Sequence, residues 1–324
     1  VLIVDDSELV RQILAQIINA SSDMVVVGAA VDPFDAREKI KQLSPDVLTL
    51  DIEMPKMDGI SFLRNLMRLR PMPVVMISTL TEKGAPATLE ALEIGAVDYL
   101  AKPKMDQARA LNEYAFDIVE KVRGAAKANL QSSEQIVGRR DARPPVSANY
   151  SKGRFIAIGA STGGTEAIKE VLLGMPANCP PIVIAQHIPP VFSTTFAERM
   201  DRTCLISVAE ATTGMVLESG KAYLAPGGFH LKVLKKGAEL ICQLDEGPTV
   251  NRHRPSVEVL FDSARDAAGA KCVAMLLTGM GSDGSEALLR LRQEGCHTLA
   301  QDEDTSVVWG MPGVAVKLGA AEFV

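Results

Sequence analysis

A serine hydroxyl on a glycine-rich turn is the first sign of chemistry in this sequence. Ser161 stands in the stretch Gly-Ala-Ser-Thr-Gly-Gly at 159–164, directly after the apolar run 155–158. The segment 165–173 that follows has the i, i+3, i+4 spacing of an amphipathic helix. The pattern predicts a strand, a tight turn and a helix, with the hydroxyl at the helix N-terminus, where negative charge is stabilised.

A serine needs a base to become a good nucleophile, and His187 is the best placed of the four histidines. It directly follows the apolar run 181–186 and precedes the helix-excluding pair Pro189-Pro190. We therefore expect His187 at the carboxyl end of a second strand. A turn like that of Ser161 is also compatible with a phosphate cradle or a plain helix cap.

The other three histidines are predicted to lie elsewhere. His297 opens the run 296–300, so it begins a strand and should lie at the opposite edge of the sheet. His230 falls within 223–234, a predicted hairpin, and is expected to decorate a strand. His253 lies in a loop before a helix, where contact with substrate and a solvated surface position both remain open.

A candidate acid partner for His187 follows a third apolar run. The apolar run 272–277 leads into Thr-Gly-Met-Gly-Ser-Asp-Gly at 278–284 and then into a helical pattern. We expect Asp283 to orient His187, although an aspartate before a glycine and a helix is also a common cap. Met280 is the candidate backbone donor to an oxyanion, or else a plain core residue.

The apolar runs alternate with helical patterns, which is typical of a parallel sheet covered on both faces. In such a sheet every strand-to-helix junction lies on the carboxyl edge, where ligands bind. Ser161, His187 and Asp283 all fall on that edge. The competing order of serine, acid and then histidine would require His297, which is predicted on the wrong edge.

The first third of the chain repeats this geometry with acidic residues. Four apolar runs, at 1–4, 46–50, 73–77 and 98–101, end in the polar residues Asp5-Asp6, Asp51, Ser78 and Lys102. Three gathered carboxylates favour a hard cation such as Mg²⁺, and Lys102 and Ser78 would contact a phosphoryl group on Asp51. Taken singly, Asp5 and Asp6 are also compatible with helix caps, and Lys102 with a surface position.

These motifs resemble a known family. Val-Asp-Asp-Ser at 4–7, Asp-Ile-Glu-Met-Pro-Lys-Met-Asp-Gly at 51–59 and Ala-Lys-Pro at 101–103 are similar to a two-component receiver domain. Together with the 159–164 turn, Gln-His-Ile-Pro at 186–189 and Leu-Thr-Gly-Met-Gly-Ser-Asp-Gly at 277–284, nearly the whole chain resembles the CheB family of chemotaxis protein-glutamate methylesterases.

The resemblance implies a phosphorylation-activated hydrolase that removes methyl esters from glutamates of methyl-accepting chemoreceptors and deamidates certain glutamines. It implies Ser161 as nucleophile, His187 as base and then acid, and Asp283 as orienter, with Thr162 and Met280 assisting at the oxyanion. In the receiver it implies Asp51 as phospho-acceptor, with the histidine kinase CheA as phosphodonor. The remaining implied roles are Mg²⁺ binding by Asp5, Asp6, Asp51 and the Glu53 carbonyl, and a phosphoryl switch of Ser78, Tyr99 and Lys102.

The expected fold is α/β in two domains. Residues 1–124 are predicted to form a flavodoxin-like receiver with a five-stranded parallel sheet. Residues 153–324 are predicted to form a doubly wound, mostly parallel, Rossmann-like domain with an antiparallel hairpin. The segment 125–152 lacks apolar periodicity and is predicted to be a linker, whose basic balance leaves contact with an acidic receptor or kinase surface open.

Composition narrows the class of protein further. The chain has 324 residues, a formal net charge of −6 and five cysteines without a pairing pattern, so disulfides and a cysteine metal site are not expected. No basic recognition helix is present, which argues against nucleic acid. With no leader pattern and no run of about 18 apolar residues, we expect a cytoplasmic protein without membrane insertion.

Two other functions are compatible with the sequence. In the first, a receiver is joined to a non-catalytic module whose Ser161 turn holds an anion. In the second, the chain is a general serine esterase with other substrates.

Overall fold

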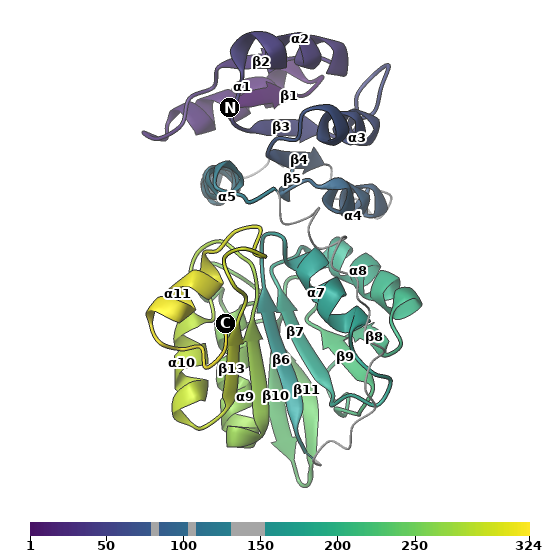
Figure 1. Cartoon of the computed structure of the whole chain (residues 1–324), viewed down its shortest axis with the longest axis vertical. Helices are drawn as coiled ribbons and strands as arrows, with labels where there is room; N and C mark the ends of the chain where they lie inside the picture. Colours follow the sequence, from purple (N-terminus) through teal and green to yellow (C-terminus); the bar gives the residue numbers. More distant parts are fainter. Residues whose placement is uncertain (79–83, 103–107, 131–152) are drawn as a thin grey trace. The chain divides into compact units, whose positions relative to one another are not determined.

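The computed structural model describes residues 1–78, 84–102, 108–130 and 153–324 (Figure 1). The chain divides into two compact units, Val1–Glu134 and Gln135–Val324. Residues 131–152 of the predicted linker and Pro103 of the Ala-Lys-Pro motif lie outside the described residues. Residues 125 and 126 of that linker are the end of a helix, α5.

The first unit alternates strands and helices. Its elements are β1 (Leu2–Val4), α1 (Glu8–Asn19), β2 (Gly28–Ala30), α2 (Pro33–Leu43), β3 (Leu48–Asp51), α3 (Gly59–Leu69), β4 (Val74–Ser78), α4 (Ala85–Ile94), β5 (Asp98–Ala101) and α5 (Ala108–Ala126). The five strands form one parallel sheet in the order β2-β1-β3-β4-β5. This is the predicted flavodoxin-like order, whose ligand site lies where β1 and β3 meet.

The second unit contains a larger parallel sheet. Its elements are β6 (Phe155–Ala160), α7 (Gly164–Leu173), β7 (Ile182–Gln186), α8 (Pro190–Thr203), β8 (Ser207–Glu210), β9 (Lys221–Leu224), β10 (His230–Lys236), β11 (Glu239–Asp245), α9 (Val257–Ala268), the 3₁₀ turn η1 (Gly269–Lys271), β12 (Cys272–Leu276), α10 (Ser285–Gln293), β13 (His297–Ala300) and α11 (Met311–Lys317). Six strands run parallel in the order β13-β12-β6-β7-β9-β8. The strands that follow β6 extend the sheet on one side through β7, and the later strands β12 and β13 extend it on the other. The strand order therefore reverses between β6 and β12, where a crevice is expected.

The hairpin is real but its predicted position was wrong. We predicted it over 223–234, whereas β10 pairs with β11 over 230–245 and β9 is a parallel strand of the main sheet. The Pro226-Gly227-Gly228 turn signal misled the prediction, because it connects two sheets and does not fold a strand back on itself. The true reversal lies between Lys236 and Glu239, around Gly237, which has φ +63°.

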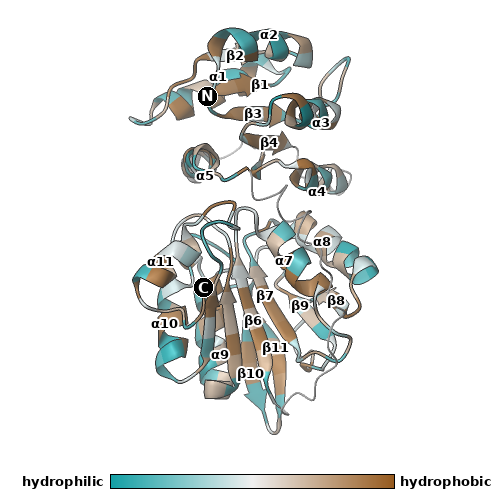
Figure 2. Cartoon of the chain, viewed as in Figure 1, coloured by the Kyte–Doolittle hydropathy of each residue, from teal (hydrophilic) through white to brown (hydrophobic). Residues whose placement is uncertain are grey.

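Both faces of the larger sheet are covered, which explains its nearly continuous apolar strands. Along β6, Phe155 and Ala157 belong to a buried cluster with α9 and α10, while Ile156 and Ile158 alternate onto the other face and are also buried. Figure 2 shows the strands as mostly hydrophobic and the outer helix surfaces as mixed. The two faces therefore fix the strand register, and with it the position of every carboxyl-edge loop.

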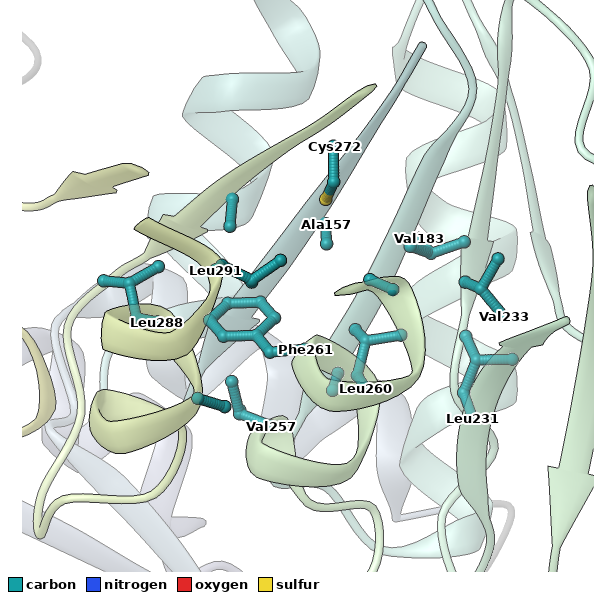
Figure 3. Packing of buried hydrophobic residues seen from close by; sticks show 14 of the residues in the cluster. Ala157, Val183, Leu231, Val233, Val257, Leu260, Phe261, Cys272, Leu288 and Leu291 are labelled. Atoms are coloured by element: carbon teal, nitrogen blue, oxygen red, sulfur yellow. The ribbon is translucent and has the colours of Figure 1, made fainter. Parts of the chain in front are cut away.

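Helix α9 is central to the cluster. Figure 3 shows Phe261 of α9 on the side of Leu288 and Leu291 of α10, and Leu260 of α9 on the side of Leu231 and Val233 of β10. Both α9 residues are fully buried. Because the N-terminus of α9 is anchored in this way, the loop that precedes it at 250–256 starts from a rigid base.

The structure also bears on the cysteines and on membrane spans. The five cysteines are free, and all but Cys204 are buried. Within the described residues, no helix has the length and apolar character needed to cross a membrane.

Candidate active site and phospho-acceptor site

Ser161 lies where the sequence predicts it, on the turn between β6 and α7. The turn closes when the N–H of Gly164 donates to the carbonyl of Ser161 at 2.7 Å. Gly163 has φ +75°, a left-handed conformation that glycine adopts without strain. A Cβ at Gly163 would also lie 2.6 Å from the Val307 side chain, so the turn requires glycine for two reasons.

His187 follows β7 directly and reaches the serine. Its backbone N–H donates to the Ala160 carbonyl at 3.2 Å, which extends the β6–β7 pairing to the histidine. Its ring Nδ1 lies 3.0 Å from Ser161 Oγ. The side chain is only 9% exposed, so water has little access to this hydrogen bond.

Asp283 completes the arrangement from the loop after β12. Its Oδ2 lies 2.8 Å from Nε2 of His187, and the residue is 2% exposed. Burial opposes ionisation, but hydrogen bonds from His187, Asn251 and Val257 outweigh it and hold the pKa of Asp283 well below its usual value. The three predicted residues therefore meet as a hydroxyl, an imidazole and an ionised acid in hydrogen-bonded series.

The histidine is turned so that Nδ1 faces the serine and Nε2 faces the acid. In serine proteases of the chymotrypsin type the two ring nitrogens have the opposite assignment. Either orientation gives the same chemistry, since one nitrogen accepts the hydroxyl proton while the other donates to the carboxylate.

Gln186, the last residue of β7, links the ends of β6 and β7 and was missed by the sequence analysis. Its Nε2 donates to the carbonyl of Ser161 at 2.8 Å and to the carbonyl of His187 at 3.2 Å. The side chain is buried, and a Cβ at Gly164 would lie 2.1 Å from its Oε1. A polar residue in the last position of a buried strand was the signal that could have identified it.

A two-residue turn at 250–253 contributes two more contacts. His253, for which two positions had been left open, is partly buried and stacks on the His187 ring with 3.6 Å between centroids and 15° between planes. Asn251, also missed, donates from Nδ2 to Asp283 Oδ1 at 2.8 Å. The signal for Asn251 was its residue type, because asparagine favours the left-handed turn conformation that it has here.

The segment 278–281 lies against the serine. Ser161 N–H donates to the Thr278 carbonyl at 3.0 Å, and a Cβ at Gly279 would lie 2.8 Å from the Ser161 Cβ. The N–H of Met280, a partly buried residue, donates no hydrogen bond to any residue that the structure describes. Thr162 is buried, and its carbonyl accepts from Thr278 Oγ1 at 3.0 Å. The roles of Met280 and Thr162 at an oxyanion stay predictions.

His297 and His230 are not part of this arrangement. His297 begins β13, as predicted, and its Nδ1 lies 2.8 Å from Glu322 Oε2 on the exposed surface. His230 begins β10, where its Nε2 lies 3.0 Å from the Pro248 carbonyl and its Nδ1 accepts the N–H of Ser256. His230 is therefore a buried support for the start of α9.

In the first unit, Asp51 ends β3 and lies beside Lys102. Lys102 Nζ lies 2.8 Å from Asp51 Oδ2 and 3.3 Å from Asp5 Oδ2. Burial, aided by the charge of Asp5 and opposed by Lys102, raises the pKa of Asp51 to about 6. Burial also raises the pKa of Asp5, whereas the two carboxylates outweigh burial and raise that of Lys102.

The acidic cluster fits a divalent cation. One carboxylate oxygen each of Asp5, Asp6 and Asp51 lies within 4.8 Å of the others. Asp5 Oδ2 is buried and accepts no hydrogen bond from the residues that the structure describes, so its ion pair with Lys102 leaves acceptor capacity free. Oxygen donors of this kind suit Mg²⁺. The alternative of plain caps fits less well, because Ser7 caps α1 and Asp5 Oδ1 accepts the Ser7 N–H.

The predicted switch residues lie on the neighbouring strands. Ser78 ends β4 and is buried, and its carbonyl accepts the N–H of Lys102 at 2.8 Å. Tyr99 of β5 is buried, with Lys121 Nζ 5.0 Å from its ring centroid. The exposed Glu53 donates its N–H to Asp51 Oδ1 at 3.4 Å, and its carbonyl stays a predicted ligand.

Comparison with known proteins matches each unit to a family. Residues 1–115 match the response regulator receiver domain, and residues 156–324 match the CheB methylesterase domain. The chain belongs to the CheB methylesterase family. It is 55% identical, over all of its length and 92% of the relative, to protein-glutamate methylesterase/protein-glutamine glutaminase 1 of Hahella chejuensis. It is 57% identical to the second such protein of Saccharophagus degradans, over 99% of this chain and 93% of the relative.

A solved structure supports the assignment of the second unit. The CheB methylesterase catalytic domain of Thermotoga maritima superposes with a TM-score of 0.52 at 36% identity, covering 54% of this chain and 93% of that domain. The CheB-family resemblance inferred from the motifs is thereby confirmed.

Proposed function

We propose that this protein hydrolyses glutamate methyl esters on methyl-accepting chemoreceptors, releases methanol, and deamidates specific receptor glutamines. The observation that carries the proposal is the series Ser161 Oγ, His187 and Asp283, joined by contacts of 3.0 and 2.8 Å. The names of the full-length relatives, which pair methylesterase with glutaminase, support the substrate class.

In the first half of the reaction Ser161 Oγ attacks the ester carbonyl carbon. His187 Nδ1 accepts the hydroxyl proton, and the carboxylate of Asp283 stabilises the imidazolium that forms. The oxyanion of the tetrahedral intermediate lies near the N-terminus of α7, where the Met280 N–H is a candidate donor and Thr162 assists. When the intermediate collapses, His187 returns the proton to the leaving methoxide, and methanol departs.

In the second half, water replaces the methanol. His187 Nδ1 accepts a proton from water as the water oxygen attacks the acyl-serine, and the proton returns to Ser161 Oγ when the ester bond breaks. The product is a glutamate side chain. A glutamine amide follows the same steps, with ammonia as the leaving group.

The receiver controls this activity through phosphorylation of Asp51, with CheA, a chemotaxis histidine kinase, as the phosphodonor. Asp5, Asp6, Asp51 and the Glu53 carbonyl would hold Mg²⁺, which neutralises charge on the transferring phosphoryl group when bound. Lys102 is within reach of a phosphoryl oxygen on Asp51, and Ser78 and Tyr99 respond to it. The site of action is the cytoplasmic side of the receptors.

The test is methanol release from methylated chemoreceptors, compared with a panel of small esters. We expect turnover on the receptors and little on the small esters. Equal turnover on both would favour a general esterase, and binding without methanol or ammonia release would favour a non-catalytic module.

A further inference from the structure

The turn before α9 is the part of the active site that the family motifs leave unexplained. Val250 and His253 exchange both backbone hydrogen bonds, at 3.1 and 2.9 Å, and the two residues between them have left-handed φ angles of 51° at Asn251 and 68° at Arg252. Two central residues with positive φ define a type I′ turn. This turn fixes the direction of the Asn251 side chain relative to the backbone.

Asn251 is exposed, yet its amide reaches a buried oxygen. Nδ2 donates to Asp283 Oδ1 at 2.8 Å. Apart from His187, the other donors to this carboxylate come from the start of α9: Ser256 Oγ at 2.8 Å, Val257 N at 2.7 Å and Glu258 N at 3.3 Å. Among the described residues, Asn251 is thus the one donor to Asp283 that belongs neither to the start of α9 nor to His187.

We infer that Asn251 is a positioning residue of the esterase site, whose amide holds Asp283 Oδ1 so that Oδ2 faces His187 Nε2. The inference rests on the proposed function. The carboxylate has two oxygens with distinct partners, and the Asn251 contact is one of the two at 2.8 Å that fix Oδ1. Loss of one of them allows the carboxylate to turn, and small misplacements of a catalytic group slow a reaction strongly.

A purely structural role for Asn251 predicts different behaviour, and two substitutions separate the roles. Asn251→Gly keeps the left-handed backbone without strain and removes the amide. Asn251→Asp keeps the shape and the tolerance of this conformation, but replaces a donor by an acceptor next to Asp283. Arg252→Gly is the matched control, since it alters the other central residue of the same turn.

Other charged groups near Asp283 are unchanged in these variants. His187 faces it from the end of β7, and His253 lies on the His187 ring. On α9, Glu258 Oε2 accepts the N–H of Gly284, and Arg290 of α10 binds Glu258. A pH effect confined to Asn251→Asp therefore reports on the introduced carboxylate.

The experiment measures methanol release from methylated receptors by the full-length protein, with acetyl phosphate and Mg²⁺, between pH 5 and 8. For Asn251→Gly we expect kcat to fall about tenfold with KM unchanged, the size of one hydrogen bond to a charged group. Asn251→Asp is expected to be slower still at pH 8, where two carboxylates face each other. As the pH falls its kcat should rise towards that of the wild type at the same pH, because the protonated acid donates to Asp283 as the amide does. Arg252→Gly should keep the wild-type kcat.

A second readout does not depend on the substrate. The Nε2–H proton of His187, which is hydrogen-bonded to Asp283, is expected to give a downfield NMR resonance. This resonance should shift in Asn251→Gly and stay in place in Arg252→Gly. Wild-type kcat at every pH in both Asn251 variants, or an unmoved resonance in Asn251→Gly, would overturn the inference. Absence of methanol release by the wild-type protein would overturn the proposed function instead, and the resonance would still decide the role of Asn251.

Discussion

The carboxylate of Asp283 accepts the backbone N–H of Val257 at 2.7 Å, so the proposed acid of the active site caps α9 and not α10, the helix that follows it in the chain. Ser256 occupies the N-cap position of α9, but its hydroxyl makes no capping bond and donates to Asp283 instead. The positive end of the α9 dipole therefore faces an ionised carboxylate. Catalytic geometry and the stability of α9 depend on the same side chain.

Substitution of Asp283 should therefore reduce stability as well as activity. Asp283→Ala leaves the buried Ser256 hydroxyl and Val257 N–H without an acceptor, and we expect a loss of about 3 kcal/mol in the free energy of unfolding. Urea denaturation followed by tryptophan fluorescence measures it, because Trp309, the single tryptophan, lies in this unit. A stability equal to wild type would contradict the capping role.

The same contribution has a predictable pH dependence. The pKa of Asp283 in the folded protein lies below its usual value of 3.8, mainly because His187 and Asn251 hydrogen bonds outweigh burial. The stabilisation is therefore complete above about pH 3.8 and decreases as the pH falls below it. We expect the stability difference between wild type and Asp283→Ala to be constant from pH 5 to 7 and to narrow only below about pH 4.

Gln186 should be needed for the alignment of serine and histidine. Gln186→Met preserves the length of the side chain but removes the Nε2 donor, so the partly buried carbonyls of Ser161 and His187 each lose a partner. We expect a loss of about 2 kcal/mol in stability and roughly a tenfold lower kcat. Lys169→Met, at a partly exposed position on α7, is the control. Unchanged kcat in Gln186→Met would show that the β6 and β7 ends are aligned without this amide.

These contacts mark the limit of what the sequence predicts. Ser161, His187 and Asp283 could be placed because each directly follows or closely succeeds an apolar strand, and all strand ends of a parallel sheet share one edge. Gln186 and Asn251 act through side-chain amides aimed across the fold. Their partners are set by the tertiary packing of β6 and α9, which local periodicity does not encode.

The misplaced hairpin has a similar cause. The glycine and proline residues at 226–228 are strong turn signals, but a turn signal does not state which strands it pairs. Here a Cβ at Gly227 would lie 2.2 Å from the backbone of Pro190, so the glycine serves a close approach to α8. In the first unit, by contrast, Asp5, Asp51 and Lys102 each stand at the end of an apolar run. Their positions were sufficient to predict that they meet at one edge of the sheet.

The buried Asp51 should make the receiver less stable at neutral pH than an isosteric amide does. Because burial raises its pKa from 3.8 to about 6, the folded state binds a proton more tightly than the unfolded state, and stability falls as the pH rises from about 4 to about 6. Without Mg²⁺, Asp51→Asn should raise the free energy of unfolding of the receiver by about 1–2 kcal/mol at pH 7 and change it little at pH 4. Hydrogen exchange of the β1 and β3 amides measures this difference in stability. Equal protection of the wild type and the variant at pH 7 would contradict the prediction.

Asp51 should also be required for stimulation. In Asp51→Ala we expect basal methanol release to persist, while acetyl phosphate with Mg²⁺ no longer raises it, because the acceptor carboxylate is gone. Chelation of Mg²⁺ should abolish stimulation of the wild-type protein in the same way. Asp58→Ala, which removes the cap of α3 without touching the cluster, is the control. Stimulation that survives in Asp51→Ala would refute the phosphorylation site.

The most direct measurement is methanol release by Ser161→Ala on methylated chemoreceptors, with the fold verified by Trp309 fluorescence. The substitution removes only the hydroxyl that lies 3.0 Å from His187 Nδ1. We expect turnover to fall at least about 10³-fold while the unfolding transition stays within about 1 kcal/mol of wild type. Turnover near the wild-type rate in a folded Ser161→Ala protein would contradict a mechanism that begins with this oxygen.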